Sequence, residues 1–418
     1  MRRWLPPRTG DGGDGKGHIV LFALITALCL VGDSMLYVVL PVRFSEMGLT
    51  SLWQVGVVLA VNRMVRLPLN PCIGWIYSRI DERTGIVCAV LLATVTTFSY
   101  GFLPGFFLWI VVRCLWGVAW TLLRLGSLFC ILQRSTDDNR GQYTGLYNGL
   151  YRLGSLVGML AGGILADTVG VRATSMVLGA LTMLSLPWVL FCVPRGSGRQ
   201  PCGSDSAFSA GWTAMTENGR TFLIVCSGGA VALAFQGVVA STLSRLISLH
   251  TNGGMEFAGM TAGAASLAGF VQALRWGWEP WLAPALGYIS DVRRERPRML
   301  FLSFAAGAAF FLLLALPLPV WFWFCCVLGM QFAATALTTL SEASAADAAG
   351  RAGGRSLLMG YALIVDVGAA LGPLFAYCVS EFWGLDAVYS ICAGMFLVLL
   401  LKWKAHMRDE ACRRKGSR

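Results

Sequence analysis

Twelve long apolar segments occupy most of this chain, and they constrain its fold more than any other feature. A helix that crosses a membrane needs about 20 mostly apolar residues, and each segment is long enough to supply one. The sequence therefore predicts an all-α polytopic membrane protein with 12 transmembrane helices. The segments lie near 18–41, 51–77, 85–104, 106–132, 142–166, 172–194, 221–247, 257–290, 298–317, 319–345, 355–380 and 384–403.

Eight ionisable side chains lie inside these apolar segments. A charge at bilayer depth costs about 2.5–3.5 kcal/mol on insertion scales, so such residues face a bundle interior or a watery cavity instead of lipid. There they bind a solute, relay a proton or pair with one another. The pattern predicts a polar central cavity, and a transporter is the simplest protein that needs one. The eight residues are Asp33, Arg63, Arg66, Arg113, Arg152, Arg275, Glu279 and Asp366.

The composition argues against several other classes of protein. Of the 418 residues, 56% are hydrophobic and only 13% are charged, whereas soluble domains carry about 25% charged residues. The net charge of +11 lies in short loops and buried arginines, without the basic stripe of a nucleic-acid-binding surface. The 13 Cys and 3 His lack metal-site spacing. We therefore expect no cofactor, no metal and no nucleic-acid partner. Without a nucleophile–base constellation or a Walker motif, we also expect neither an enzyme nor an ATP-driven pump.

Loop composition divides the chain into two halves. A segment rich in Gly, Ser and charge follows the sixth apolar segment and is typical of a mobile linker. Lys and Arg gather in alternate loops, and the positive-inside rule then places both termini in the cytoplasm. Short loops without an organelle-targeting signature favour a bacterial inner membrane. The predicted parts are an N-terminal tail at 1–17, a six-helix lobe at 18–194, a linker at 195–220, a second six-helix lobe at 221–403 and a basic tail at 404–418.

The two halves also repeat each other in sequence. NPCIGWIYS, which contains Pro71, resembles LAPALGYISD, which contains Pro284, at an offset of 213 residues. GSLVG from Gly154 matches GAALG from Gly368 at an offset of 214. Two sites at nearly the same offset indicate a duplicated half, and two related six-helix halves are what a two-lobed transporter requires.

Four motifs at matching helix positions make the chain resemble the major facilitator superfamily over its whole length. The loop after the second helix reads GWIYSRIDER, with Ser78 in place of the family's acid, and the loop after the eighth reads GYISDVRR and keeps the acid. Arg113 begins an RxxxG pattern that the family links to proton coupling. The glycine ladder of the fifth helix resembles that of exporters, with Met159 where Pro is usual, and its second copy keeps Pro373.

The resemblance implies a rocker-switch transporter in which the loops and glycine ladders act in gating and conformational change. The glycines equally fit ordinary close helix packing, and the loop arginines fit membrane topology alone. The residues to which these roles are assigned are Gly74, Ser78, Arg79, Arg83, Gly154, Gly158, Gly162, Gly287, Asp291, Arg293, Gly368, Gly372 and Pro373.

The charges near mid-bilayer do not balance. Five arginines face three acids there, a formal excess of two positive charges. Guanidinium groups bind carboxylates and phosphates in bidentate fashion, so we expect an anionic or zwitterionic organic substrate to supply the missing charge. The alternative is that backbone carbonyls, waters and the three acids satisfy the arginines. The predicted cavity residues are Arg63, Arg66, Arg152, Arg275, Glu279, Asp366, Gln236 and Gln272.

Asp33 is the predicted proton carrier, and Arg113 is predicted to act in proton coupling. The arginine partner of Asp33 is expected to be a residue such as Arg113 or Arg63. A buried carboxyl that loses its arginine partner in one state of a rocking transporter takes up a proton in that state only. Asp366 is the second candidate for this role. The alternative is a static Asp–Arg ion pair that holds the fold.

The predicted function is proton-coupled export of a small organic solute by a membrane-embedded monomer that uses no cofactor. Uptake or exchange of an organic anion fits the arginine excess equally well. A third interpretation is a receptor or assembly factor on a transporter fold, which the degenerate loop at Ser78 supports.

Overall fold

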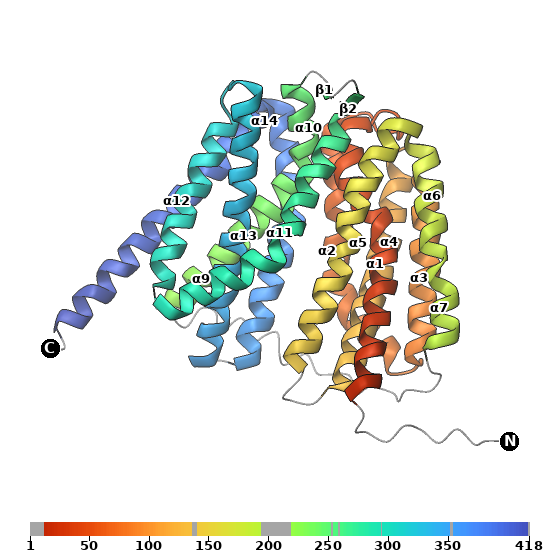
Figure 1. The fold of residues 1–418 in the computed structure, drawn as a ribbon, viewed down its shortest axis with the longest axis horizontal. Helices are drawn as coiled ribbons and strands as arrows, with labels where there is room; N and C mark the ends of the chain where they lie inside the picture. The colour runs from red at the N-terminus through yellow and green to blue at the C-terminus, as the bar shows by residue number, and fades with distance from the viewer. Residues whose placement is uncertain are drawn as a thin grey trace.

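The computed structural model describes residues 12–135, 140–193, 219–251, 254–257, 260–293, 295–351 and 354–416. Nearly all of these residues are helical, and the described strands form one short hairpin. Figure 1 shows the helices in two bundles that stand side by side, one from each half of the chain. The predicted all-α membrane fold agrees with this architecture. The count of 12 spans, the cytoplasmic termini and the domain boundaries stay predictions.

The N-terminal bundle is built from α1 (Gly12–Arg43), α2 (Leu52–Tyr77), α3 (Glu82–Ser99), α4 (Phe106–Arg134), α5 (Arg140–Val169), α6 (Val171–Met183) and α7 (Ser185–Cys192). The C-terminal bundle is built from α9 (Gly219–Val231), the π-helix η1 (Ala232–Val239), α10 (Ala240–His250), strands β1 (Gly254–Phe257) and β2 (Met260–Gly263), α11 (Ala264–Arg293), α12 (Arg296–Leu314), α13 (Val320–Arg351) and α14 (Gly354–Gly416). Most of the predicted linker, and the N-terminal tail up to residue 11, lie outside the described residues.

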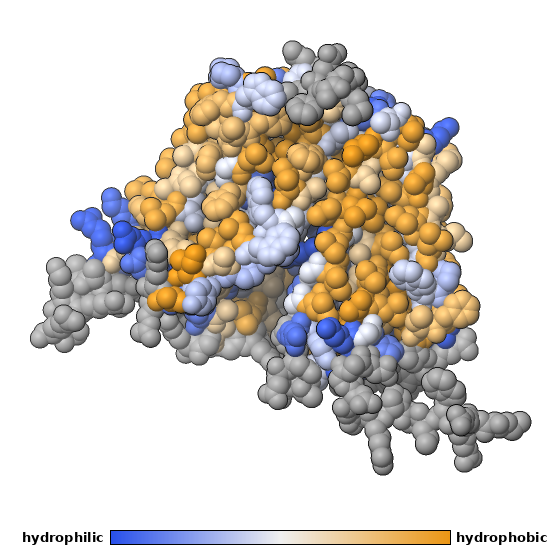
Figure 2. Space-filling model, in the orientation of Figure 1, coloured by the Kyte–Doolittle hydropathy of each residue, from blue (hydrophilic) through white to orange (hydrophobic). Residues whose placement is uncertain are grey.

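Nine described helical stretches are long and apolar enough to cross a membrane. Figure 2 shows hydrophobic side chains over most of the near face of both bundles, as expected for a surface in contact with lipid. The long helices α2 and α11 are not among the nine. Arg63 and Arg66 are half-buried on α2, and Arg275 is buried on α11. Charges within long helices are expected to face the interior between the bundles instead of lipid.

Two segments differ from the helices expected there. The eighth helix was expected to begin at residue 257, but residue 257 ends β1 and residues 260–263 form β2, and in this antiparallel pair Gly254 lies opposite Gly263. Four glycines between residues 253 and 263 weaken a helix there. At the other end of the bundle, α14 runs through the predicted tail as far as Gly416. It bends sharply at Gly384, whose φ of 76° lies in the left-handed region that favours glycine.

Glycines set the distance between neighbouring helices within each bundle. Gly154, Gly158 and Gly162 lie along one face of α5 against α1, where any Cβ would collide with α1 atoms. The α1 residues that they meet are Ala27, Val31 and Met35. In the second bundle, α14 approaches α9 and η1 in the same way, through Gly368 and Gly372 against Gly229 and Gly237. Both ladders therefore act in packing inside a bundle.

The two bundles touch on the side of the molecule opposite the chain termini, which we call the far side. A Cβ at Gly56 of α2 would lie 2.8 Å from the carbonyl oxygen of Pro373 in α14. A Cβ at Gly163 of α5 would lie 2.6 Å from the carbonyl oxygen of Ala265 in α11. Figure 2 shows a hollow between the bundles that opens toward the side of the termini, with hydrophilic atoms in it. The bundles thus form a V that is closed at the far side.

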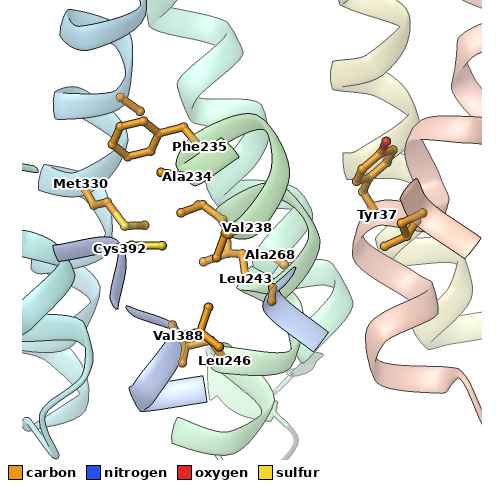
Figure 3. Close-up of a cluster of buried hydrophobic side chains, with 14 of the residues drawn as sticks. Tyr37, Ala234, Phe235, Val238, Leu243, Leu246, Ala268, Met330, Val388 and Cys392 are labelled. Atoms are coloured by element: carbon orange, nitrogen blue, oxygen red, sulfur yellow. The ribbon is translucent and has the colours of Figure 1, made fainter. Parts of the chain in front are cut away.

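The larger apolar cluster of buried side chains contains residues of both bundles, and a smaller one lies within the N-terminal bundle. Figure 3 shows Phe235, Met330 and Cys392 of the C-terminal bundle pointing toward one another, with Tyr37 of α1 standing apart from them. The aromatic ring of Phe235 also packs against those of Phe311 and Phe396, at centroid distances of 5.5 and 5.6 Å.

Candidate functional site

A buried ion pair joins three helices of the N-terminal bundle. Arg113 of α4 is 0% exposed and donates from Nη1 to Oδ1 of Asp33 in α1, which is 5% exposed. The side-chain amide of Asn62 in α2 donates to the same carboxylate oxygen at 3.4 Å. The Nε of Arg113 donates to the carbonyl oxygen of Val58 at 3.0 Å. The carboxylate of Asp33 in α1 therefore bonds to side chains of both α2 and α4 and links the three helices.

The pair leaves two polar atoms without partners. The Nη2 of Arg113 and the Oδ1 of Asn62 are buried and unbonded in the described part of the chain. Protonation of Asp33 would remove the counter-ion of Arg113, and an unpaired buried charge is strongly destabilising. The coupling role predicted for these two residues stays a prediction, as does the alternative of a static ion pair.

Two arginines on one face of α2 have no ion pair among the described residues. Arg63 and Arg66 are three residues apart, so their side chains share a face. The Nε of Arg63 donates to the hydroxyl of Tyr37 at 3.3 Å. The guanidinium of Arg66 lies 4.9 Å from the ring centroid of Trp120, and its Nε is buried without a partner. Asp366 of α14 interacts electrostatically with both arginines from the other bundle.

A second ion pair crosses between the bundles. Arg152 of α5 donates to Oε1 of Glu279 in α11 at 2.9 Å, and their side chains are 40% and 18% exposed. Arg275, one helical turn before Glu279, is 6% exposed and has no ion pair among the described residues. The guanidinium groups of Arg152 and Arg275 lie 5.4 and 5.8 Å from the ring centroid of Trp276. Two guanidinium groups therefore lie near one indole ring, and one of them is paired with a carboxylate.

Polar side chains of α11 and α13 continue this surface. Gln331 donates to the Oε1 of Gln272 at 3.2 Å, and both side chains are buried. The indole N–H of Trp278 donates to the hydroxyl of Thr335 at 3.2 Å. Gln236, which was predicted in the cavity, is half-buried on η1. Its place in the cavity stays a prediction.

Some residues of this region were not singled out from the sequence. The ring of Trp120 lies against Arg66 of α2. The hydroxyl of Tyr151 accepts a hydrogen bond from Arg124 of α4 at 3.0 Å. Gln331 and Thr335 were also missed. Their spacing of four in an otherwise apolar helix puts them on one face, and this was the available signal.

The predicted gating loops make contacts inside their own bundles. After α2, the hydroxyl of Ser78 donates to the carbonyl oxygen of Trp75 at 2.6 Å, and Arg83 donates to the carbonyl oxygen of Leu190. The guanidinium of Arg79 lies 3.9 Å from the ring centroid of Trp75. Within the part of the chain that the structure describes, these contacts hold the loop against its own bundle.

The second copy of the loop is held by charges. Arg296 at the start of α12 pairs with both Asp291 and Asp347, and it donates to the carbonyl oxygen of Ala343 at 3.0 Å. The side chain of Arg293 lies outside the described residues. Gly74 and Gly287 have open space where a Cβ would stand. Their gating roles remain predictions.

A polar contact holds the bundles together at the far side. Asp167 at the end of α5 accepts from the backbone N–H of Ser266 at 2.9 Å and from its hydroxyl at 2.6 Å. The carboxylate thereby caps the first turn of α11 from the other bundle. Arg43 pairs with the same carboxylate at 3.4 Å. Nearby, the backbone N–H of Trp53 donates to Glu381 of α14 at 3.0 Å.

Asp167→Ala is expected to loosen the far side. Loss of a helix cap costs about 0.5–2 kcal/mol, which corresponds to roughly 2- to 30-fold in an opening equilibrium. Hydrogen–deuterium exchange of residues 264–270 should accelerate by that factor. Glu46→Ala is the matched control, because Glu46 pairs with the same Arg43 at 3.0 Å but is exposed and touches only its own bundle. Unchanged exchange in Asp167→Ala would show that the cap does not hold the bundles.

No group of three or more His, Cys, Asp or Glu is placed to hold a metal ion within the described ranges. The polar groups of the hollow are instead arginines, carboxylates, amides and aromatic rings. Such groups bind organic ions by charge, hydrogen bonds and ring stacking.

Sequence comparison finds a family match over most of the chain. Residues 22–364 match the profile of the Major Facilitator Superfamily. The chain is 30% identical to the human synaptic vesicular amine transporter over 132 residues, which is 31% of this chain and 26% of that protein. It is 23% identical to an uncharacterized MFS-type transporter of Methanocaldococcus jannaschii over 175 residues, covering 41% of this chain and 45% of that protein. The chain thus matches less than half the length of these relatives.

Solved structures share the fold across nearly the full length. The nucleoside transporter NupG has a TM-score of 0.73 at 15% identity, covering 93% of this chain and 98% of that one. A bacterial homolog of the human lysosomal transporter Spinster, in an inward-facing and unoccupied conformation, has a TM-score of 0.69 at 15% identity, with coverages of 94% and 95%. At this level of identity the likeness concerns the fold alone.

Proposed function

Because the chain belongs to the Major Facilitator Superfamily and is a secondary transporter, we propose that it moves an organic anion or zwitterion by proton-coupled alternating access. The single observation that carries the proposal is the charge balance of the hollow. Of its five predicted arginines, Arg113 and Arg152 have carboxylate partners. Three others have no ion pair among the described residues. These three are Arg63, Arg66 and Arg275.

One carboxylate of the set, Asp366, has no ion pair among the described residues, so the unpaired groups carry an excess of two positive charges. Arginines at bilayer depth require counter-charge or water. A substrate anion supplies that charge only when it is bound, so its binding is favoured over that of a neutral solute of the same size. Asp366 faces the α2 arginines from the other bundle and suits the ammonium group of a zwitterion.

The Asp33–Arg113 pair is the proposed coupling site. Protonation of Asp33 removes the negative charge that pairs with Arg113. The guanidinium of Arg113 must then bind another partner or move. The pair joins α1, α2 and α4, so its opening changes how the N-terminal bundle meets the C-terminal one. Export against proton entry is the proposed direction, in keeping with the exporter-like glycine ladder of α5. We assign the protein to a bacterial inner membrane with cytoplasmic termini, so the hollow opens toward the cytoplasm.

The test uses purified protein in liposomes that contain a pH-sensitive dye. We expect organic anions to drive proton movement, and Arg63→Gln, Arg66→Gln and Arg275→Gln each to reduce the rate about 10- to 100-fold. This is the expected loss when a hydrogen bond to a charged group is removed. Arg172→Gln is the matched control, because Arg172 is exposed and stacks on Phe102 at 4.7 Å. Proton movement that survives all three changes would overturn the proposal.

Amine transport is a second candidate function. The 132 residues that are 30% identical to the human synaptic vesicular amine transporter favour it, and Asp366 could pair with an ammonium group. If the protein transports amines, cations should drive proton movement in the liposomes, and Asp366→Asn should abolish it. Proton movement that is driven by anions and lost in the arginine variants would exclude amine transport.

A further inference from the structure

The bridge between Arg152 and Glu279 is the starting point of a further inference. It spans the two bundles at 2.9 Å, and both side chains are partly exposed. The second carboxylate oxygen of Glu279 is buried without a partner in the described part of the chain. An ion pair that only held the bundles together would be expected to use both oxygens, because partly satisfied buried carboxylates are costly. The Arg152–Glu279 pair therefore leaves one carboxylate oxygen of Glu279 unused, which is not expected of a purely structural ion pair.

A second cation beside the bridge lacks an anion of its own. Arg275 lies four residues before Glu279 on α11, and it interacts electrostatically with Glu279 and Arg152. Its Nε is buried and unbonded among the described residues. Both guanidinium groups lie within 6 Å of the ring centroid of Trp276, at 5.4 Å for Arg152 and 5.8 Å for Arg275. Two guanidinium groups thus lie near one indole ring, and of the two only that of Arg152 forms an ion pair among the described residues.

We propose that Glu279 is an internal stand-in for the anionic group of the substrate, and that a substrate carboxylate displaces it from Arg152. The proposal rests on the proposed anion transport and assigns one subsite to it. In the loaded state, Arg152 from one bundle and Arg275 from the other hold the carboxylate over Trp276. Planar carboxylates match this site, because guanidinium forks bind them in bidentate fashion and the indole ring stacks on an attached aromatic ring.

The exchange links binding to movement of the bundles. In the empty protein Arg152 contacts Glu279, which is covalently part of α11, so the pair links the two bundles. In the loaded protein Arg152 contacts the substrate instead, which is covalently attached to neither bundle. The bundles are then free to change the angle between them. A neutral solute cannot displace Glu279, and a cation would bind to Glu279 itself. Glu279→Gln should therefore raise the affinity for an anionic ligand and lower the affinity for a cationic one.

The test is isothermal titration of the purified full chain with benzoate, benzamide and benzylamine, which share a ring and differ in charge. Glu279→Gln is expected to bind benzoate about tenfold more tightly than the wild type, if Arg152 is free of Glu279 about one tenth of the time. Benzamide affinity should stay within twofold. Glu279→Asp keeps the charge on a shorter arm, so it should give a smaller gain for benzoate.

A double-mutant cycle separates competition from general loosening. If Glu279 acts by occupying Arg152, Glu279→Gln should change benzoate affinity less than twofold in an Arg152→Gln background. The matched control is Glu342→Gln, because Glu342 also interacts electrostatically with Arg152 but makes no ion pair among the described residues. It should leave benzoate affinity within about threefold of the wild type.

The outcomes distinguish the inference from the function on which it rests. If benzoate binds the wild type and Glu279→Gln equally, or binds the variant more weakly, Glu279 is a structural bridge and the inference is wrong, while anion transport stands. If benzoate binds neither protein, both proposals fall. If benzylamine binds and Glu279→Gln abolishes its binding, Glu279 belongs to a cation site, and both are again overturned.

Discussion

Asp33→Ala is expected to lower the free energy of unfolding by about 3–5 kcal/mol and to abolish transport. The change leaves the fully buried guanidinium of Arg113 without its counter-ion, and removal of one partner from a buried pair typically costs this much. Thermal unfolding in detergent measures the first effect, and solute-driven proton movement in liposomes measures the second. The amide of Asn62 also loses its acceptor, which adds to the loss.

A double variant separates coupling from stability. Asp33→Ala combined with Arg113→Leu removes both charges and should recover most of the lost stability, since apolar replacement of a buried ion pair is often neutral or stabilising. Proton-coupled transport should stay absent, because no titrating group remains at this place. Recovery of proton movement in the double variant would assign coupling to another acid, with Asp366 the first to examine.

Gly154→Ala should cost about 1–3 kcal/mol and reduce the yield of folded protein. The new methyl group would collide with the backbone of Ala27 in α1. Backbone atoms cannot move aside as a flexible side chain can, so α1 and α5 must separate along their shared face. Because α1 also carries Asp33, transport should fall even in the fraction that folds. Thermal unfolding and transport by the purified fraction are the measurements.

Gly149→Ala is the matched control on the same helix. A Cβ at Gly149 meets no atom within 4 Å, so the change should raise stability by about 0.5–1 kcal/mol through the higher helix propensity of Ala. A similar loss in both variants would mean that α5 needs glycine for flexibility at each position. The packing interpretation of the ladder would then be wrong.

Much of the fold follows from the sequence alone, because lipid leaves few alternatives. Every backbone polar group in the bilayer must be bonded internally, so a chain of long apolar segments can only form helices there. The charged residues within those segments predict which helices line the interior. Arg63, Arg66, Arg275 and Glu279 lie on α2 and α11, the two long helices too polar to count as ordinary membrane spans.

The sequence-based prediction was wrong at the start of the eighth helix, where apolar residues favour a helix and glycines oppose it. A helix was predicted from residue 257, yet residue 257 ends β1 and residues 260–263 form β2, because glycines oppose a helix there. Gly263 also lies against the carboxylate of Asp167. That carboxylate belongs to the other half of the chain, about 100 residues earlier. The sequence around Gly263 contains no sign of it.

The sequence by itself determined the membrane class and the family, and it predicted the positions of the interior charges and the excess of arginines. These follow from residue type and spacing, since the cost of a charge in lipid depends only on its presence in an apolar segment. Only the tertiary structure decided which charges are partners. Arg113 pairs with Asp33, 80 residues away, and Arg152 pairs with Glu279, 127 residues away. Coulomb attraction acts through space over a few ångströms, so it depends on how the helices are placed around one another, which spacing along the chain does not encode.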